Sequence, residues 1–236
     1  MVAAVTLATL QGRIASRLID PSSVAVPVAA ITTAVNDSVA FWSTRMFYFN
    51  QYVANLTLDV SHALDGSATS DPYVLGYENT NALYPNAPVL PQNFGFEDPE
   101  NGFTIPYNYL TYNLKKESQA IYDNANLRGV GLPYIYTYRA GNYEIYFLPQ
   151  IAYTLRVNYY AAYQPLVNST DSNDFTNYAT KLIEYDATAR LLSDLRLDDE
   201  RADRMNARAQ IEYVNLKSRS RKQSATGHLT VDSVLS

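Results

Sequence analysis

Residues 132–163 read LPYIYTYRAGNYEIYFLPQIAYTLRVNYYAAY, and this stretch decides the fold class. Read with a period of two, it divides into three runs at residues 133–139, 143–148 and 153–161, all rich in Tyr, Ile, Val, Thr and Phe. These residue types suit a pleated, half-buried surface. The three runs therefore predict three strands.

The short connections between the runs predict how the strands pair. Gly141 and Asn142 tolerate positive φ, and Pro149 presets a turn, so each strand is expected to fold back antiparallel on the one before it. The result is a three-stranded antiparallel β-meander. Because so small a sheet is marginal alone, we expect helices from both ends of the chain to cover its aromatic face.

Composition sets the outer limits of fold and function. The chain has 236 residues, is 47% hydrophobic and carries a net charge of -5, so it can bury a core. An acidic balance argues against an obligate nucleic-acid binder, because duplex affinity comes mostly from Lys and Arg. The absence of cysteine excludes disulfides and thiolate chemistry.

The N-terminus does not favour a signal peptide, since Arg13 and Arg17 lie inside the would-be apolar segment. The longest uncharged stretch, residues 21–36, contains two prolines and is shorter than the ~20 residues of a membrane span. We therefore expect a soluble protein with no membrane partner.

Helical patterns occupy both ends of the chain and predict a base of antiparallel helices over residues 5–50 and 174–218. Thr6 is the expected cap of the first helix, and Pro27 stands where a first-turn proline belongs in the second. In the C-terminal half, residues 172–174 read Ser-Asn-Asp and predict one helix start. Residues 198–200 read Asp-Asp-Glu and predict another, because acid is favoured at a helix N-terminus.

A β-rich insertion is expected between the helical segments, over residues 51–163. Residues 51–60 alternate as a strand, whereas residues 61–113 offer only short strands and turns and residues 115–124 a short helix. Beyond the helices, residues 219–236 lack periodicity and predict a flexible tail. The fold class is therefore α+β, with one domain over residues 1–218.

Catalytic motifs are nearly absent, and we expect neither an enzyme nor a cofactor. The only histidines are His62 and His228, and no GxSxG, Walker or GxGxxG pattern occurs. Asp59, His62 and Asp65 lie close in sequence, but a solvated turn explains them better than a metal site does. The acidic run at residues 198–203 lacks the EF-hand spacing, and a helix start explains it.

Three sets of residues suggest contact surfaces. Trp42, Phe47 and Tyr48 belong to an aromatic cluster that either completes the core or faces another subunit. Arg201, Arg204 and Arg208 share a helix face with acids between them, which favours a solvated or intersubunit salt-bridge face.

The third set is a basic run followed by the expected tail. It suits docking onto an acidic protein surface or a nucleic-acid backbone, and a merely solubilising tail is the alternative. Its candidate docking residues are Lys217, Arg219, Arg221, Lys222, His228, Leu229 and Val231.

The order of several short motifs resembles the head-to-tail adaptor proteins of short-tailed bacteriophages and their relatives. The motifs are GxP at 131–133, the glycine-asparagine turn and proline of 138–149, YTLxxxYY at 153–160, the Ser-Asn-Asp helix start, LIxYxATxxLLxDLRLDDERA at 182–202 and VNDSVAFWSTRMFYFNQ at 35–51. The likeness covers about two thirds of the chain and is weak over residues 61–113.

This resemblance implies a structural protein of the virion, located at the head-tail junction and in the host cytoplasm during assembly. Such adaptors form a ring, typically a dodecamer, that joins the portal to the tail and extends the DNA channel. The implied partners are further copies of the chain, the portal protein, the nozzle, hub or fibre proteins of the tail, and genomic DNA that passes without sequence-specific binding. Residues 217–236 would then dock on the portal.

Two other functions remain open at this stage. The Tyr- and Asn-rich segment at residues 73–112 suggests a carbohydrate-binding or adhesive module, because tyrosine rings stack on sugars. The basic tail suggests a nucleic-acid-binding protein, whose affinity would depend steeply on salt.

Overall fold

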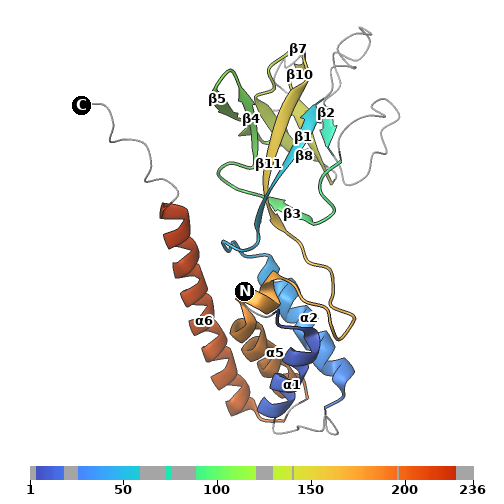
Figure 1. Ribbon diagram of the computed structural model, residues 1–236, viewed down its shortest axis with the longest axis vertical. Coiled ribbons are helices and arrows are strands. Elements are labelled where there is room, and N and C mark those ends of the chain that lie inside the picture. The colour runs from blue at the N-terminus through green and yellow to red at the C-terminus, as the bar shows by residue number, and fades with distance from the viewer. Residues whose placement is uncertain are drawn as a thin grey trace, which may run out of the picture. The chain divides into compact units, whose positions relative to one another are not determined.

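The fold is mixed α+β, as the sequence predicts. The computed structural model describes residues 4–18, 26–58, 73–75, 89–120, 130–139, 141–195 and 197–226. The chain divides into two compact units (Figure 1), a helical unit formed by residues 1–51 and 162–236 and a β unit formed by residues 52–161. The sequence places this insertion at residues 51–163.

The helical unit begins with α1 (Leu7–Arg17) and α2 (Val28–Ser43). The hydroxyl of Thr6 accepts a hydrogen bond from the backbone N–H of Thr9 and caps α1, as expected. Pro27 is the N-cap residue of α2 and not its first helical residue.

The C-terminal half supplies α4 (Asp174–Tyr178), α5 (Thr180–Asp194) and α6 (Asp199–Thr226). Asn173 and Thr176 form a capping box at the start of α4. The single helix predicted from this start is divided at Ala179, whose φ of -117° and ψ of 24° lie outside the α-helical region. A short connection then returns the chain, so that α6 packs against α5.

Helix α5 lies at the centre of this unit, because it contacts α1, α2, α4 and α6. Its buried side chains lie on most sides of the helix and include two carboxylates, Glu184 and Asp186. The surrounding core combines aliphatic residues of α1 and α2 with an aromatic group in which the rings of Phe47 and Phe49 stack at 5.2 Å. Phe175 meets both rings edge-on.

The β unit contains a five-stranded sheet built around β11 (Tyr153–Ala161). The strand order is β1 (Gln51–Leu58), β11, β4 (Phe103–Tyr107) and β5 (Leu110–Asn113), and β3 (Phe94–Glu97) also pairs with β11. Alternate β11 residues are buried, among them Leu155 and Val157.

The second sheet has four strands, in the order β2 (Tyr73–Leu75), β9 (Asn142–Tyr146), β8 (Ile135–Arg139) and β6 (Lys115–Lys116). The antiparallel β8–β9 hairpin is the one the sequence predicts, and Gly141 in its turn has a φ of 87°. Two further short strands, β7 (Val130–Gly131) and β10 (Leu148–Pro149), pair in parallel.

The predicted three-stranded meander is wrong in its third strand. β11 pairs with β1, β3 and β4 and not with β9. The alternating patterns predict the strands themselves. The strand residues that pair with β11, however, lie more than fifty positions earlier in the chain, and periodicity carries no information about such distant pairing.

The sequence predicts a short helix over residues 115–124, but the first two of these residues are not helical. Lys115 and Lys116 form β6, parallel to β8. The backbone N–H of Lys115 donates to the carbonyl of Tyr134, and that of Glu117 donates to the carbonyl of Tyr136. An open strand edge therefore outweighs local helical propensity.

Leu192 tests whether the apolar stripe of α5 is core. Its side chain is 2% exposed and packs with Ala189, Ala202 and Met205. Leu192→Ala is expected to lower the free energy of unfolding by about 2–5 kcal/mol, because it leaves a cavity. The change is measured by urea denaturation.

Leu195→Ala is the matched control, since Leu195 is 43% exposed, and it should change stability by about 0.5 kcal/mol or less. Equal denaturation midpoints for the two variants would contradict this core.

Candidate functional site

Helix α6 carries most of the charged residues singled out in the sequence. Asp198 caps it, because its Oδ1 accepts a hydrogen bond of 2.9 Å from the backbone N–H of Arg201. Asp199 and Glu200 occupy its first turn, where the helix dipole favours acid. The predicted buried stripe is confirmed at Ala202, Met205, Ala209 and Leu216.

A polar network ties the first turns of α6 to α1 and α5. The Nε atom of Arg17 donates to Oε1 of Glu184, a residue only 4% exposed. The guanidinium of Arg17 also lies over the ring of Tyr185, 4.6 Å from its centroid. Arg201 completes the network by donating from Nη2 to the backbone carbonyl of Arg17.

The three arginines predicted to share one face therefore do different things. Arg201 holds α6 against α1, and the guanidinium of Arg208 lies 5.9 Å from the centroid of the Tyr185 ring. Arg204 pairs with Glu200 at 3.3 Å on the exposed surface, where such a pair contributes little to stability. Arg204 and Arg208 are both exposed, whereas Arg201 is half-buried.

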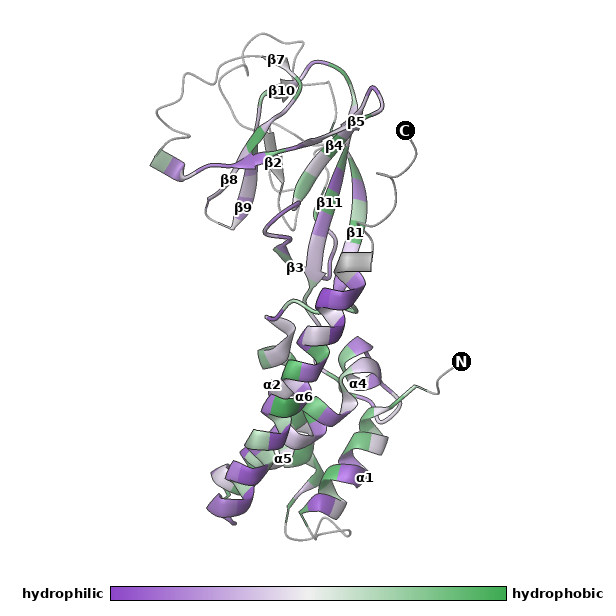
Figure 2. Cartoon of the chain, turned by 90° about the vertical axis from the view of Figure 1, so that its left-hand side faces the viewer, coloured by the Kyte–Doolittle hydropathy of each residue, from purple (hydrophilic) through white to green (hydrophobic). Residues whose placement is uncertain are grey.

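The outer side of α6 exposes apolar residues, which the sequence analysis missed. Ile211 is 60% exposed and Val214 is 61% exposed. Ala207, also exposed, precedes them at helical spacing, so the three form a stripe on the side of α6 away from Ala209 and Leu216. Figure 2 shows green apolar segments alternating with purple hydrophilic ones along this helix. In the sequence, Ala207, Ile211 and Val214 recur at spacings of four and three residues between the buried positions. This second helical period is the signal that could have revealed the stripe.

The C-terminal end of α6 corrects the predicted tail. The helix continues through Arg219 to Thr226, so Lys217, Arg219, Arg221 and Lys222 lie on its last turns and not in a flexible segment. The remaining candidate docking residues, His228, Leu229 and Val231, lie outside the described residues.

A side-chain contact explains why the helix extends. The hydroxyl of Ser220 accepts a hydrogen bond of 3.2 Å from the backbone N–H of Tyr48 and donates to the carbonyl of Leu216. This tertiary contact supports the last turns, where no apolar stripe is present for a pattern to detect.

A basic groove lies beside the end of α6. It has a volume of about 320 Å³, and Arg13 of α1, Lys181 of α5 and Arg219 of α6 line it together with Glu212 and the exposed Tyr178. Within the described ranges, these three basic residues form no ion pair. The groove and the basic end of α6 can both receive an acidic partner.

The aromatic candidates lie mostly in the core. Trp42 is 3% exposed and Phe47 is 1% exposed, so neither presents a surface to another subunit. Trp42 instead packs on Tyr213 of α6, with ring centroids 5.1 Å apart. Tyr48 is half-buried beside Tyr178.

Exposed apolar surface near the end of α2 comes from other residues. Phe41 and Met46 are 45% and 52% exposed. The guanidinium groups of Arg45 and Arg190 lie 5.7 Å and 5.4 Å from the centroid of the Phe41 ring.

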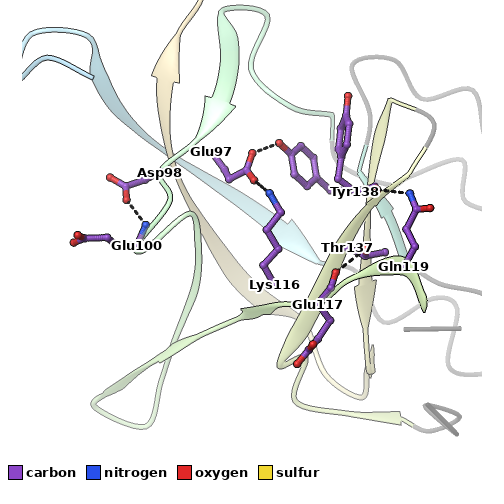
Figure 3. A network of polar contacts seen from close by, with 9 residues as sticks. Glu97, Asp98, Glu100, Lys116, Glu117, Gln119, Thr137 and Tyr138 are labelled. Carbon is purple, nitrogen blue, oxygen red and sulfur yellow. Dashed lines mark hydrogen bonds and ion pairs between the residues drawn. The ribbon is translucent and has the colours of Figure 1, made fainter. Parts of the chain in front are cut away.

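The β unit has its own polar network, centred on Glu97 (Figure 3). Its carboxylate accepts hydrogen bonds from Nζ of Lys116 and from the hydroxyl of Tyr143. Glu97 belongs to the five-stranded sheet, whereas Lys116 and Tyr143 belong to the four-stranded sheet. The side chain therefore ties the two sheets together.

This network shifts the ionisation of its members. Burial disfavours the charged form of Glu97, but the hydrogen bonds from Lys116 and Tyr143 outweigh that effect and lower the pKa of its carboxyl. Burial, together with the charges of Glu97 and Asp98, raises the pKa of Tyr136 to about 12. These shifts fit a structural tie between the two sheets.

No group of three or more metal-ligating side chains occurs in the part of the chain that the structure describes. Asp59, His62 and Asp65 lie outside it. None of the described helices is both long and apolar enough to cross a membrane.

Comparison with known proteins adds no assignment. No family model matches the chain, and a search of curated proteins finds no relative.

The Glu97 tie predicts an acid-sensitive β unit. Folding lowers the pKa of the Glu97 carboxyl below its ordinary value of 4.5. The ionised carboxylate therefore contributes its full stabilisation above pH 4.5, and this contribution is lost as the pH falls through the folded-state pKa. Glu97→Gln should lower stability at pH 7 and reduce its pH dependence below pH 4.5. Urea denaturation at pH 7 and at acidic pH measures both effects.

Glu100→Gln provides the control, because Glu100 is exposed on the neighbouring turn. The tie is refuted if the two variants show the same pH dependence.

Proposed function

We propose that this protein is a structural virion component, a head-to-tail adaptor that forms a ring between the portal and the tail and extends the DNA channel. The observation that carries the proposal is α6, a helix of 28 residues with an apolar stripe on each of two opposite sides and a basic C-terminal end. One stripe packs against the other helices of the unit, and the other stripe is exposed, where a neighbouring copy would cover it.

The outer stripe suits association between identical chains. Burying an isoleucine or valine side chain contributes about 1.5–3 kcal/mol, and the exposed fractions of Ile211 and Val214 leave more than half of that gain available. A contact between this stripe and a different surface of the next copy is heterologous, and such a contact closes into a ring when the rotation between copies is a whole fraction of a turn. In a ring, weak contacts reinforce one another through effective concentration.

Charge is distributed as a DNA channel would require. The β unit, residues 52–161, has five Lys and Arg against ten Asp and Glu, whereas the helical unit has thirteen of each. A net negative charge repels the DNA backbone, so it would favour passage of DNA without binding.

The resemblance to adaptors gains support from the role of the 182–202 motif. Those residues form α5, the connection and the start of α6. The motif specifies Arg201, which donates to the backbone carbonyl of Arg17 and so holds α6 against α1. A motif shared with the adaptors would therefore preserve the packing between these helices.

The basic end of α6 is the proposed portal contact. Arg219 and Arg221 are exposed, and an acidic surface on the portal would complement them. The ten residues after Thr226, GHLTVDSVLS, follow directly and would extend this contact.

Ring formation tests the outer stripe. The double variant Ile211→Asp, Val214→Asp should remain folded, because both positions are exposed, but it should lose assembly with the portal into complexes of several copies. Sedimentation velocity of the protein mixed with the portal ring of the same genome measures the assembly.

The matched control is Gln210→Asp, Asn215→Asp, which adds the same charge at exposed positions beside the stripe. It should assemble. Normal assembly of the Ile211 and Val214 variant would exclude the stripe as the subunit contact.

Portal docking is tested by Arg219→Glu, Arg221→Glu. This variant retains Ser220 and its bond to Tyr48, so it should fold normally while its affinity for the portal falls at least tenfold. Lys115→Glu, Arg156→Glu makes the same charge change at exposed sites of the β unit and should bind normally. Equal affinities for the two variants would contradict docking through α6.

A further inference from the structure

The tip of the β4–β5 hairpin has an unusual backbone. Tyr107 pairs with Leu110, which leaves Asn108 and Tyr109 as a two-residue turn. Their φ values are 50° and 64°. A two-residue turn with two positive φ values is a type I′ turn, for which Asn-Gly is the favoured sequence. Asn108 meets this preference, and Tyr109 stands where glycine is expected.

Among the described residues, no contact compensates for this conformation. A tyrosine in the left-handed region is strained, because its Cβ crowds the backbone. The Tyr109 side chain is 108% exposed, and Leu110 beside it is 60% exposed. Among the described residues, Tyr109 has no ring contact or hydrogen bond. By contrast, the ring of Tyr107 packs edge-on against Tyr153 at 5.5 Å.

The chemistry of the tip favours protein recognition. Residues 107–113 read YNYLTYN and contain no charged residue, although the β unit around them has twice as many acids as bases. Aromatic residues are enriched and charged ones depleted at the centres of protein interfaces, and Tyr and Asn are typical of protruding binding loops. An acidic unit with an uncharged tip matches neither a phosphate backbone nor an anionic membrane.

The shape of the tip indicates which partner supplies the pocket. Sites for sugars and other small molecules are concave, whereas Tyr109 projects from a turn. The partner must therefore provide the concavity. Two grooves on the described part of the helical unit include Arg13, Arg17, Lys181, Glu184 and Glu212 in their lining, so these two do not match an uncharged ring.

We propose that Tyr109 and Leu110 form an insertion tip that docks in an uncharged, apolar pocket of a different protein. The inference rests on the proposed function, in which that protein is a tail component meeting the adaptor. The strained tyrosine is then retained for binding at a cost in stability. Its replacement by glycine should therefore stabilise the chain and weaken docking.

Two variants separate binding from folding. Tyr109→Gly creates the favoured Asn-Gly turn and should raise the thermal midpoint by about 2–4 °C. Tyr109→Phe keeps the ring in the same backbone conformation and should leave the midpoint unchanged. In co-sedimentation with the tail proteins of the same genome, Tyr109→Gly should bind at least tenfold more weakly, whereas Tyr109→Phe should bind within about threefold of the unchanged protein.

A photo-crosslinking amino acid, p-benzoylphenylalanine, identifies the partner. Placed at position 109 of the full chain during assembly, it should join the chain to one tail protein. At position 111, an exposed residue on β5, it should not. Crosslinks only between copies of this chain, no crosslink above the position 111 control, or unchanged tail binding by Tyr109→Gly would each overturn the proposal, as would glycan-array binding that depends on Tyr109.

The portal assay distinguishes this inference from the proposed function. Tyr109→Gly should still assemble with the portal, because the tip lies in the β unit and the proposed portal contact is on α6. Failure of the unchanged protein to assemble with the portal would count against the adaptor function, whereas loss of tail binding alone would concern the tip.

Discussion

The ion pair between Arg17 and Glu184 is the interaction on which the helical unit depends. Glu184 is buried on α5, where an uncompensated carboxylate would be strongly destabilising. Arg17, at the end of α1, supplies the opposite charge and stacks on Tyr185, and its own carbonyl accepts a hydrogen bond from Arg201 of α6. Satisfying one buried charge therefore positions three helices.

That arrangement determines what α6 presents to its surroundings. Because Ala202, Met205 and Leu216 are held against the rest of the unit, Ile211 and Val214 must point away from it. A surface that covered Ile211 and Val214 would remove their apolar area from water and so stabilise the contact. In the proposed ring, this stripe on one copy would meet a different surface of the next copy, and the same contact would repeat around the ring.

The β unit consists of a hydrogen-bonded framework of two sheets and a strained hairpin tip. Strands β1 and β11, where the chain enters and leaves the unit, are hydrogen-bonded neighbours, so an insertion of this length closes on itself. Glu97 then ties its two sheets. Strain persists in proteins where the surrounding structure determines it, and the β4–β5 pairing holds Tyr109 in the left-handed region in this way.

The sequence by itself determined the features that depend on near neighbours. Caps at Thr6, Asn173 and Asp198, the apolar stripes of the helices and the β8–β9 turn all follow from interactions within a few residues. Only the tertiary structure decided which strands pair with β11, that Trp42 is core, and that α6 continues past Arg219. It also decided which side of α6 remains exposed. Each of these outcomes depends on groups far apart in the chain, whose contacts leave no local period in the sequence.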